Sequence, residues 1–109
     1  MAFKKYDFEL TETAESDIDS AYDYIAKTLE NPDAASALAD ELEIQIDNIC
    51  KKPETGRLVE NDFLRSNNIR RFLVKNYIAY YIIDDNNKKI VILRFVYGGR
   101  DQDKILKEL

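Results

Sequence analysis

The chain has 109 residues, a length that predicts one domain over residues 1–109 with a thin core that can still fold alone. Its 16 Lys and Arg and 21 Asp and Glu side chains give a formal net charge of −5, which argues against binding nucleic acid by bulk attraction to phosphate. With no histidine and a single cysteine, Cys50, an internal disulfide and the familiar Cys/His metal or nucleophile sites are excluded, and we expect no metal and no cofactor.

The charge is unevenly divided along the chain. Residues 1–52 hold 5 Lys and Arg against 13 Asp and Glu, a net charge of −8, whereas residues 53–109 hold 11 against 8, a net charge of +3. A local basic face is therefore compatible with the second half. No apolar run approaches the roughly 20 residues that span a membrane, and residues 1–10 lack the apolar core of a signal peptide. We expect a cytoplasmic protein without a membrane partner.

The first half of the chain predicts a short strand and then a helix. Residues 6–10 (YDFEL) alternate aromatic and acidic side chains, which is typical of a half-exposed strand. Thr11 or Thr13 can cap a helix of about five turns, with Glu12 and Glu15 near its positive end. Apolar residues at steps of three and four give this helix one apolar stripe. The stripe comprises Ala14, Ile18, Ala21, Tyr22, Ile25 and Leu29.

A second helix follows after a short turn. Asn31 is placed as its cap and Pro32 as its first residue, and Pro53 stops it. Its stripe comprises Ala35, Leu38, Leu42, Ile46, Ile49 and Cys50. Cys50 is therefore expected to be a small buried hydrophobe. Two such helices should pack as an antiparallel hairpin whose apolar stripes need a cover.

The second half predicts the sheet that supplies this cover. Residues 53–68 are expected to form a loop, and residues 101–109 a short helical tail. Between them, three runs rich in Val, Ile, Tyr and Phe are separated by the turn residues Lys75-Asn76 and 84–87 (DDNN). The fold class is α+β, in the order β-α-α-β-β-β, with an antiparallel sheet covered on one face by the helical hairpin.

Three segments of these strands carry a resemblance to a known family. IRRF at residues 69–72, YIAYY at residues 77–81 and LRFVYGGRD at residues 93–101 resemble the toxin superfamily named for RelE and ParE, and the likeness extends over nearly the whole chain. The resemblance implies the toxin component of a bacterial type II toxin–antitoxin (plasmid stabilisation) module, silenced by a cognate antitoxin. RelE-like members cleave messenger RNA in the ribosome, whereas ParE-like members poison DNA gyrase.

The motifs are more similar to the ParE branch. RelE-like members place an arginine after the tyrosine that opens the middle strand, and here that position is Ile78. Their C-terminal tyrosine falls near Leu106, and histidine is absent. Gyrase poisoning works through a protein surface and needs no bond-breaking residue, so we favour a ParE-like toxin. A ribosome-dependent endoribonuclease and a non-toxic interaction domain of the same fold are the alternatives.

The candidate site is built from arginines and tyrosines of the second half. For a nuclease, Arg100 and the phosphate clamps Arg71 and Arg94 would act with Tyr97 or Tyr81 as proton carrier. For binding, acidic residues of the antitoxin would meet the same three arginines. The residues expected to contact the antitoxin or the target, whether gyrase or ribosome and messenger RNA, are Arg71, Tyr81, Arg94, Tyr97 and Arg100.

Plainer roles compete at several of these positions. Arg94 lies within an apolar strand and is equally compatible with a structural ion pair to Asp7 or Glu9 on the first strand. Arg70 and Arg71 are adjacent and must point to opposite faces. The tyrosines within residues 77–81 are more typical of packing in the core or on the sheet surface than of catalysis. The pair at 98–99 (GG) is expected to allow a sharp turn after the last strand.

Overall fold

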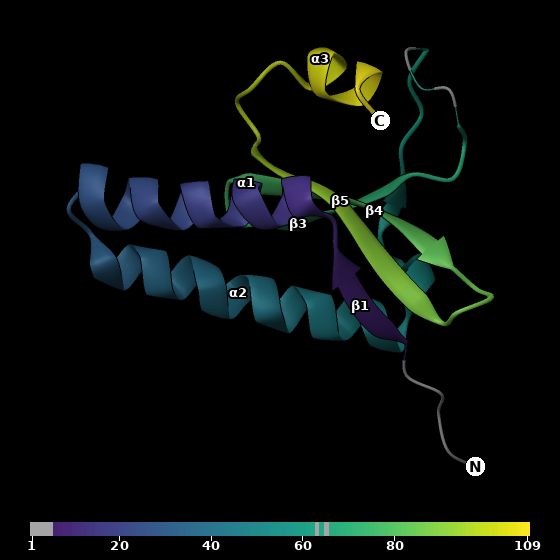
Figure 1. Ribbon diagram of the computed structural model, residues 1–109, viewed down its shortest axis with the longest axis horizontal. Helices are drawn as coiled ribbons and strands as arrows, with labels where there is room; N and C mark the ends of the chain where they lie inside the picture. Colours follow the sequence, from purple (N-terminus) through teal and green to yellow (C-terminus); the bar gives the residue numbers. More distant parts are fainter. Residues whose placement is uncertain (1–5, 63, 65) are drawn as a thin grey trace.

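A computed structural model describes residues 6–62, 64 and 66–109. A single five-stranded sheet, in the order β1-β5-β4-β3-β2, forms one layer. Helices α1 and α2 lie side by side as an antiparallel pair, and the short helix α3 lies apart from them (Figure 1). The α+β fold expected from the sequence is confirmed.

The strands are β1 (Asp7–Leu10), β2 (Arg57–Leu58), β3 (Arg70–Val74), β4 (Tyr77–Asp84) and β5 (Lys89–Tyr97). The helices are α1 (Glu12–Asp23), η1 (Tyr24–Thr28), α2 (Pro32–Lys51), η2 (Pro53–Thr55) and α3 (Gln102–Lys107).

Helix α1 begins as predicted and ends differently. The Thr11 hydroxyl accepts a hydrogen bond from the backbone N–H of Ala14 at 3.0 Å, which satisfies a donor of the first turn. At Tyr24 the α-helix gives way to the π-helix η1, in which each hydrogen bond spans one residue more. The later residues therefore leave the phase of the apolar stripe, and Leu29, which the sequence placed in that stripe, is exposed. Tyr22, the other exposed member of the predicted stripe, lies within α1 at the edge of its apolar face.

Helix α2 follows the prediction closely. The side-chain oxygen of Asn31 accepts from the N–H of Ala34 at 3.1 Å, and Pro32 occupies the first helical turn. All six residues of the predicted stripe are buried, Cys50 among them. The helix ends before Pro53, where the short helix η2 begins.

The sheet corrects two expectations. Strand β1 pairs with β5 in parallel, so the sheet is antiparallel only from β5 to β2. Between β1 and the other strands, the chain runs out along α1 and returns along α2, so β1 can lie beside β5 at the edge of the sheet. Strand β2 lies in the segment expected to be a loop, because two residues are too short to show an alternating pattern.

Two apolar clusters lie on opposite faces of the sheet. On the face covered by α1 and α2, here called the hairpin face, Phe72, Ala79 and Tyr81 pack with the helix stripes. On the other face, here called the tail face, Ile105 and Leu106 of α3 pack against Ile69 and against β4 and β5. Within the described part of the chain, none of the helices is long and apolar enough to cross a membrane.

Candidate interaction surface

A row of four polar side chains crosses the tail face of the sheet. Arg57 of β2 lies directly opposite Arg71 of β3, Arg71 opposite Tyr80 of β4, and Tyr80 opposite Arg94 of β5. Directly opposed residues of antiparallel strands point to the same face, so these four form one line, here called the arginine row. The row joins residues that are up to 37 positions apart in the sequence.

Beside the outer end of the row the surface forms a hollow of about 610 Å³. It is lined by Arg57, Leu58, Val59, Glu60, Asn61, Arg71, Tyr80, Gln102 and Leu106. The Tyr80 hydroxyl donates a hydrogen bond to the side-chain oxygen of Gln102 at 2.7 Å. Burial raises the pKa of Tyr80 above its usual value, and the hydrogen-bonded Arg71 guanidinium partly opposes this shift. The hydroxyl at the base of the hollow is therefore a neutral donor at physiological pH.

Arg57 and Arg71 give the hollow its positive charge. Like charges directly opposite in a sheet repel each other, and no carboxylate of the described residues forms an ion pair with either guanidinium. An incoming carboxylate or phosphate would relieve this repulsion and could accept charge-assisted hydrogen bonds from both groups. Chemically, the hollow suits an anionic side chain of a partner.

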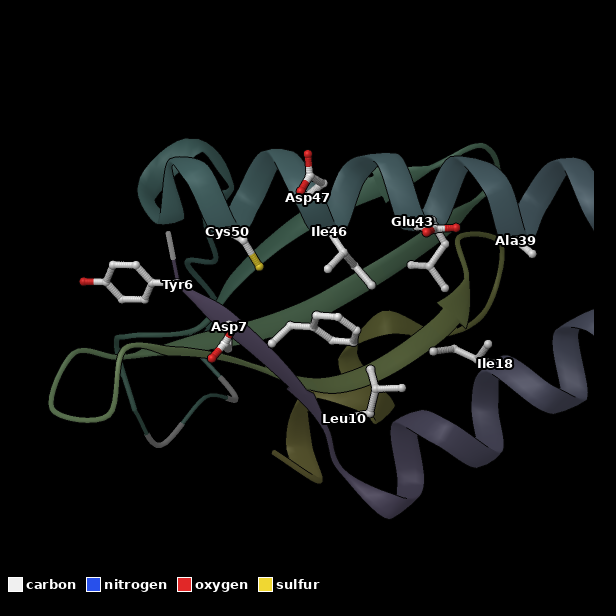
Figure 2. Close-up of a pocket in the computed structure, with 11 residues that line it drawn as sticks. Tyr6, Asp7, Leu10, Ile18, Ala39, Glu43, Ile46, Asp47 and Cys50 are labelled. Atoms are coloured by element: carbon white, nitrogen blue, oxygen red, sulfur yellow. The ribbon is translucent and has the colours of Figure 1, made fainter. Parts of the chain in front are cut away.

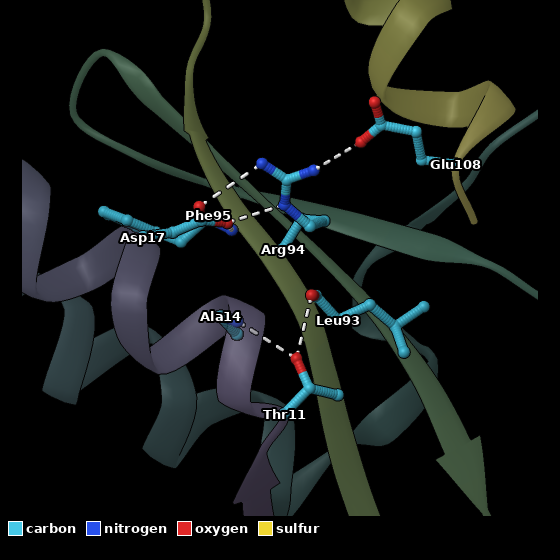
Figure 3. Close-up of polar contacts among 7 residues, drawn as sticks. All are labelled: Thr11, Ala14, Asp17, Leu93, Arg94, Phe95 and Glu108. Carbon is cyan, nitrogen blue, oxygen red and sulfur yellow. Dashed lines mark hydrogen bonds and ion pairs between the residues drawn. The ribbon is translucent and has the colours of Figure 1, made fainter.

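Arg94, at the other end of the row, already has partners (Figure 3). Its Nε donates to Oδ2 of Asp17 at 2.7 Å, its Nη2 lies 3.3 Å from Oδ1 of Asp17, and its Nη1 lies 3.0 Å from Oε2 of Glu108. The hydrogen bond to Asp17 is the main cause that raises the pKa of Arg94. A structural ion pair was therefore predicted correctly, but its partners are on α1 and the C-terminal segment.

Neither of the expected partners on β1, Asp7 and Glu9, forms an ion pair with Arg94. Pairing of β1 with β5 ends at Ile92, and α1 then runs beside the free edge of β5. There the Thr11 hydroxyl donates to the carbonyl oxygen of Leu93 at 3.0 Å, and Oδ2 of Asp17 accepts the backbone N–H of Phe95 at 3.0 Å. Asp17 thus bonds both to the backbone at this edge and to the Arg94 side chain. Glu9 instead forms an ion pair with Lys89.

Tyr81 is part of the hairpin-face core. Its hydroxyl donates to the carbonyl oxygen of Pro53 at 2.6 Å and accepts from the N–H of Gly56 at 3.0 Å. Burial raises the pKa of Tyr81. The structure therefore places this side chain where a partner has no access to it, which argues against the surface contact and the proton-carrier role considered from the sequence.

Tyr97 and Arg100 lie near the end of β5, outside the lining of the hollow. The half-exposed Tyr97 ring meets the Tyr77 ring edge-on, with 5.8 Å between centroids. A Cβ on Gly99 would collide with the Tyr97 ring, and none of the described glycines has a positive φ. The constraint at Gly99 is therefore the space beside this ring, not an unusual backbone angle. Arg100 is exposed in the turn before α3.

The expected site residues thus do not form one cluster. Arg71 and Arg94 share the arginine row, Tyr81 is in the core, and Tyr97 and Arg100 lie beyond the row. Arg70 and Arg71 do point to opposite faces, because Nη1 of Arg70 donates to the carbonyl oxygen of Gly56 at 2.7 Å on the hairpin side. No group of three or more His, Cys, Asp or Glu side chains among the described residues is placed to hold a metal ion.

Sequence reasoning missed Arg57, Tyr80 and Gln102 as members of the hollow. Arg57 lay in a segment expected to be a loop, and its neighbour across the strand, Arg71, is 14 positions away. Pairing between strands that distant is not encoded in any local pattern. The available signal was the spacing of Arg71 and Tyr80 about the Lys75-Asn76 turn, because a two-residue hairpin fixes which residues face each other.

Comparison with known proteins identifies this architecture. In a chromosomal ParDE toxin–antitoxin system from P. aeruginosa, one chain superposes with a TM-score of 0.66 at 19% identity, covering 85% of this chain and 96% of that one. The RelBE2 toxin–antitoxin complex from Mycobacterium tuberculosis matches with a TM-score of 0.61 at 20% identity, covering 86% and 99%. A mutant of the E. coli toxin RelE in the free state matches with 0.61 at 10% identity, covering 96% of each chain.

At these identities the superpositions show that this chain shares its fold with these three chains, and nothing further. No curated protein sequence gives a significant match. The family model described as the ParE toxin of the type II toxin–antitoxin system, parDE, matches residues 8–102. Because this match covers most of the chain, the protein belongs to the ParE toxin family.

Proposed function

We propose that this protein is a ParE-type toxin that arrests growth by poisoning DNA gyrase in the cytoplasm, and that a cognate antitoxin neutralises it. Membership of the ParE family supports the proposal at the level of the family. A role in plasmid stabilisation follows if the pair is carried on a plasmid.

Two buried aliphatic residues are the main observation that favours gyrase poisoning over RNA cleavage. Ile78 stands where the resemblance to RelE implies an arginine, and Leu106 lies near the position of the implied tyrosine. Both are buried in the apolar cluster of the tail face. RNA cleavage needs groups that transfer protons and stabilise a charged phosphate, and an aliphatic core supplies neither. A toxin that acts by binding its target needs no such groups.

The arginine row supplies the binding surface in this proposal. The guanidinium groups of Arg57 and Arg71 meet acidic side chains of the antitoxin or the target at the hollow, with Arg100 adding charge nearby. Arg94 contributes indirectly, because its ion pairs hold α1 and the C-terminal segment against the sheet. Tyr97 stands opposite Tyr77 on the hairpin face, so its half-exposed ring would form a separate contact with a partner.

Expression of the gene alone, and then together with its neighbour, tests the proposal. Growth arrest that the neighbouring gene relieves is expected, and the purified toxin should inhibit supercoiling by gyrase. Cleavage of translated messages with gyrase unaffected would support the endoribonuclease instead, and harmless expression would support a non-toxic interaction domain.

Substitution tests the surface separately. Arg71→Glu should weaken binding to the antitoxin or abolish gyrase inhibition, because it places a negative charge in the hollow. Lys75→Glu makes the same change in charge at the turn between β3 and β4, outside the hollow, and is the matched control. Equal behaviour of the two variants would remove the arginine row from the interface.

A further inference from the structure

A second concave surface lies on the hairpin side, at the opposite edge of the sheet from β2. It is a groove of about 530 Å³ between β1 and the two long helices (Figure 2). Its apolar lining comes from three elements: Leu10 from β1, Ile18 from α1, and Ile46 and Cys50 from α2. Figure 2 shows these side chains directed toward the space between β1 and α2.

The groove is open because the helices do not fully cover β1. Phe8 is 51% exposed, although Ile90, its partner across the strand pair, is 1% exposed. The two side chains point to the same face, so Phe8 has the orientation of a core residue without a cover. A large aromatic side chain exposed at the mouth of an apolar groove is characteristic of an interaction site.

Carboxylates border this groove. Asp7, Glu43 and Asp47 belong to its lining, and no Lys or Arg among the described residues does. Asp40, Glu43 and Asp47 follow one another on α2 at helical spacing, so their negative charges share one side of this helix, and Glu43 and Asp47 line the groove. Lys51 forms an ion pair with Asp47 at 3.0 Å, which leaves Glu43 as the main source of negative charge on the α2 side of the groove.

We propose that this groove binds a segment of the antitoxin that is apolar on one side and carries Lys or Arg on the other. This inference rests on the proposed function, because it takes the partner to be the antitoxin. The apolar side chains of the segment would cover Phe8 and Ile46, and its cations would lie over Glu43 on α2. The antitoxin would thus meet the toxin with a basic segment here and with acidic groups at the arginine row.

Charge argues against two other occupants. A second copy of this chain, related by a twofold axis, would bring the same carboxylates into opposition across the interface. An anionic lipid surface would be repelled by the same groups. A cationic amphipathic segment fits both the apolar lining and the carboxylate border.

Binding of the purified product of the neighbouring gene, measured by titration calorimetry with the full-length toxin, tests this inference. Phe8→Ala and Glu43→Lys should each weaken binding by roughly 10-fold or more, because each removes a central contact. The Glu43→Lys effect should shrink at high salt, since salt screens surface charges. Leu29→Ala, an exposed side chain after η1, and Asp19→Lys, an exposed acid of α1, both outside the lining, are the matched controls.

The outcomes separate this inference from the proposed function. Loss of affinity in the groove variants, with the controls within about twofold of the wild type, supports the inference. Wild-type affinity in both groove variants together with a loss in Arg71→Glu overturns it while leaving the proposed function intact. Failure of the wild-type toxin to bind the neighbour's product overturns both. Circular dichroism of each variant shows whether it is folded, and Glu43→Lys, on an exposed helix face, provides a test if Phe8→Ala does not fold.

Discussion

Arg94 joins three segments that are far apart in the sequence. Its guanidinium contacts Asp17 of α1 and Glu108 at the end of the chain, while its backbone belongs to β5. The side chain is only 12% exposed, so the ion pair with Asp17 is shielded from solvent, whereas the Glu108 side chain is 55% exposed. Removal of one member of a shielded pair leaves the other as an uncompensated charge, which costs more than the pair itself contributes.

We therefore predict that Arg94→Ala lowers the free energy of unfolding by about 2 kcal/mol, because Asp17 keeps a partly buried carboxylate without its main partner. Glu108→Gln removes an exposed partner of the same guanidinium and should cost less than about 1 kcal/mol. Urea unfolding followed by circular dichroism measures both values. Similar losses for the two variants would contradict the central role of Asp17.

At the scale of elements, the segment η2–β2 is attached to the sheet through Tyr81. The Tyr81 hydroxyl bonds to the carbonyl oxygen of Pro53 and to the N–H of Gly56, and Arg70 bonds to the carbonyl oxygen of Gly56. The φ and ψ angles of Gly56, −65° and 145°, are open to any residue. A Cβ at Gly56 would nevertheless collide with the Tyr81 ring and its hydroxyl. Glycine is required here because the ring comes so close.

We expect Gly56→Ala to destabilise the protein by about 2 kcal/mol, since the buried Tyr81 ring can move away only by disturbing the core. Tyr81→Phe keeps the ring and removes two hydrogen bonds, with an expected cost of about 1 to 2 kcal/mol. In the double variant the ring atoms still oppose the new Cβ, so the hydroxyl deletion should not rescue Gly56→Ala. Thermal unfolding of the three variants measures this. Full rescue would show that the hydroxyl alone causes the conflict.

The elements differ in how far the sequence could predict them. The stripe of α2 was predictable in full because a helical period is a local property of the chain, and the caps at Thr11 and Asn31 mark where each helix begins. The stripe predicted for the first helix holds only in part, because Tyr22 and Leu29 are exposed. The parallel placement of β1 and the existence of β2 depend on pairings over long sequence separations, which no local pattern contains. For the same reason the ion pair of Arg94 was predictable as chemistry, but its partners on α1 and the C-terminal segment were not.

At the scale of the whole molecule, the two concave surfaces differ in charge. The hollow on the tail face has Arg57 and Arg71 in its lining, and the groove on the hairpin side has Asp7, Glu43 and Asp47. This division follows the charge along the chain, because residues 1–52 build β1 and the helices, while residues 53–109 build the remaining strands. A partner with oppositely charged segments can therefore be oriented by electrostatics as well as held by apolar contacts.

Both faces of the sheet also depend on neutral tyrosines, which predicts how stability changes with pH. Burial raises the pKa of Tyr77, Tyr80 and Tyr81 above the ordinary value of 10.0. As the pH rises past the ordinary value, the unfolded chain loses these protons before the folded protein does. The unfolded state then binds fewer protons, so stability is fully present below about pH 10 and falls as the pH rises toward the folded pKa values.

Urea unfolding at a series of pH values from about 8 to 11 measures this dependence. We expect a decline above about pH 10 that is shallower in Tyr81→Phe, because that variant has one buried phenol fewer to ionise. Tyr22→Phe removes an exposed phenol of α1 and is the matched control. A decline that is identical in Tyr81→Phe and the wild type would show that groups other than the buried tyrosines cause the loss of stability in alkali.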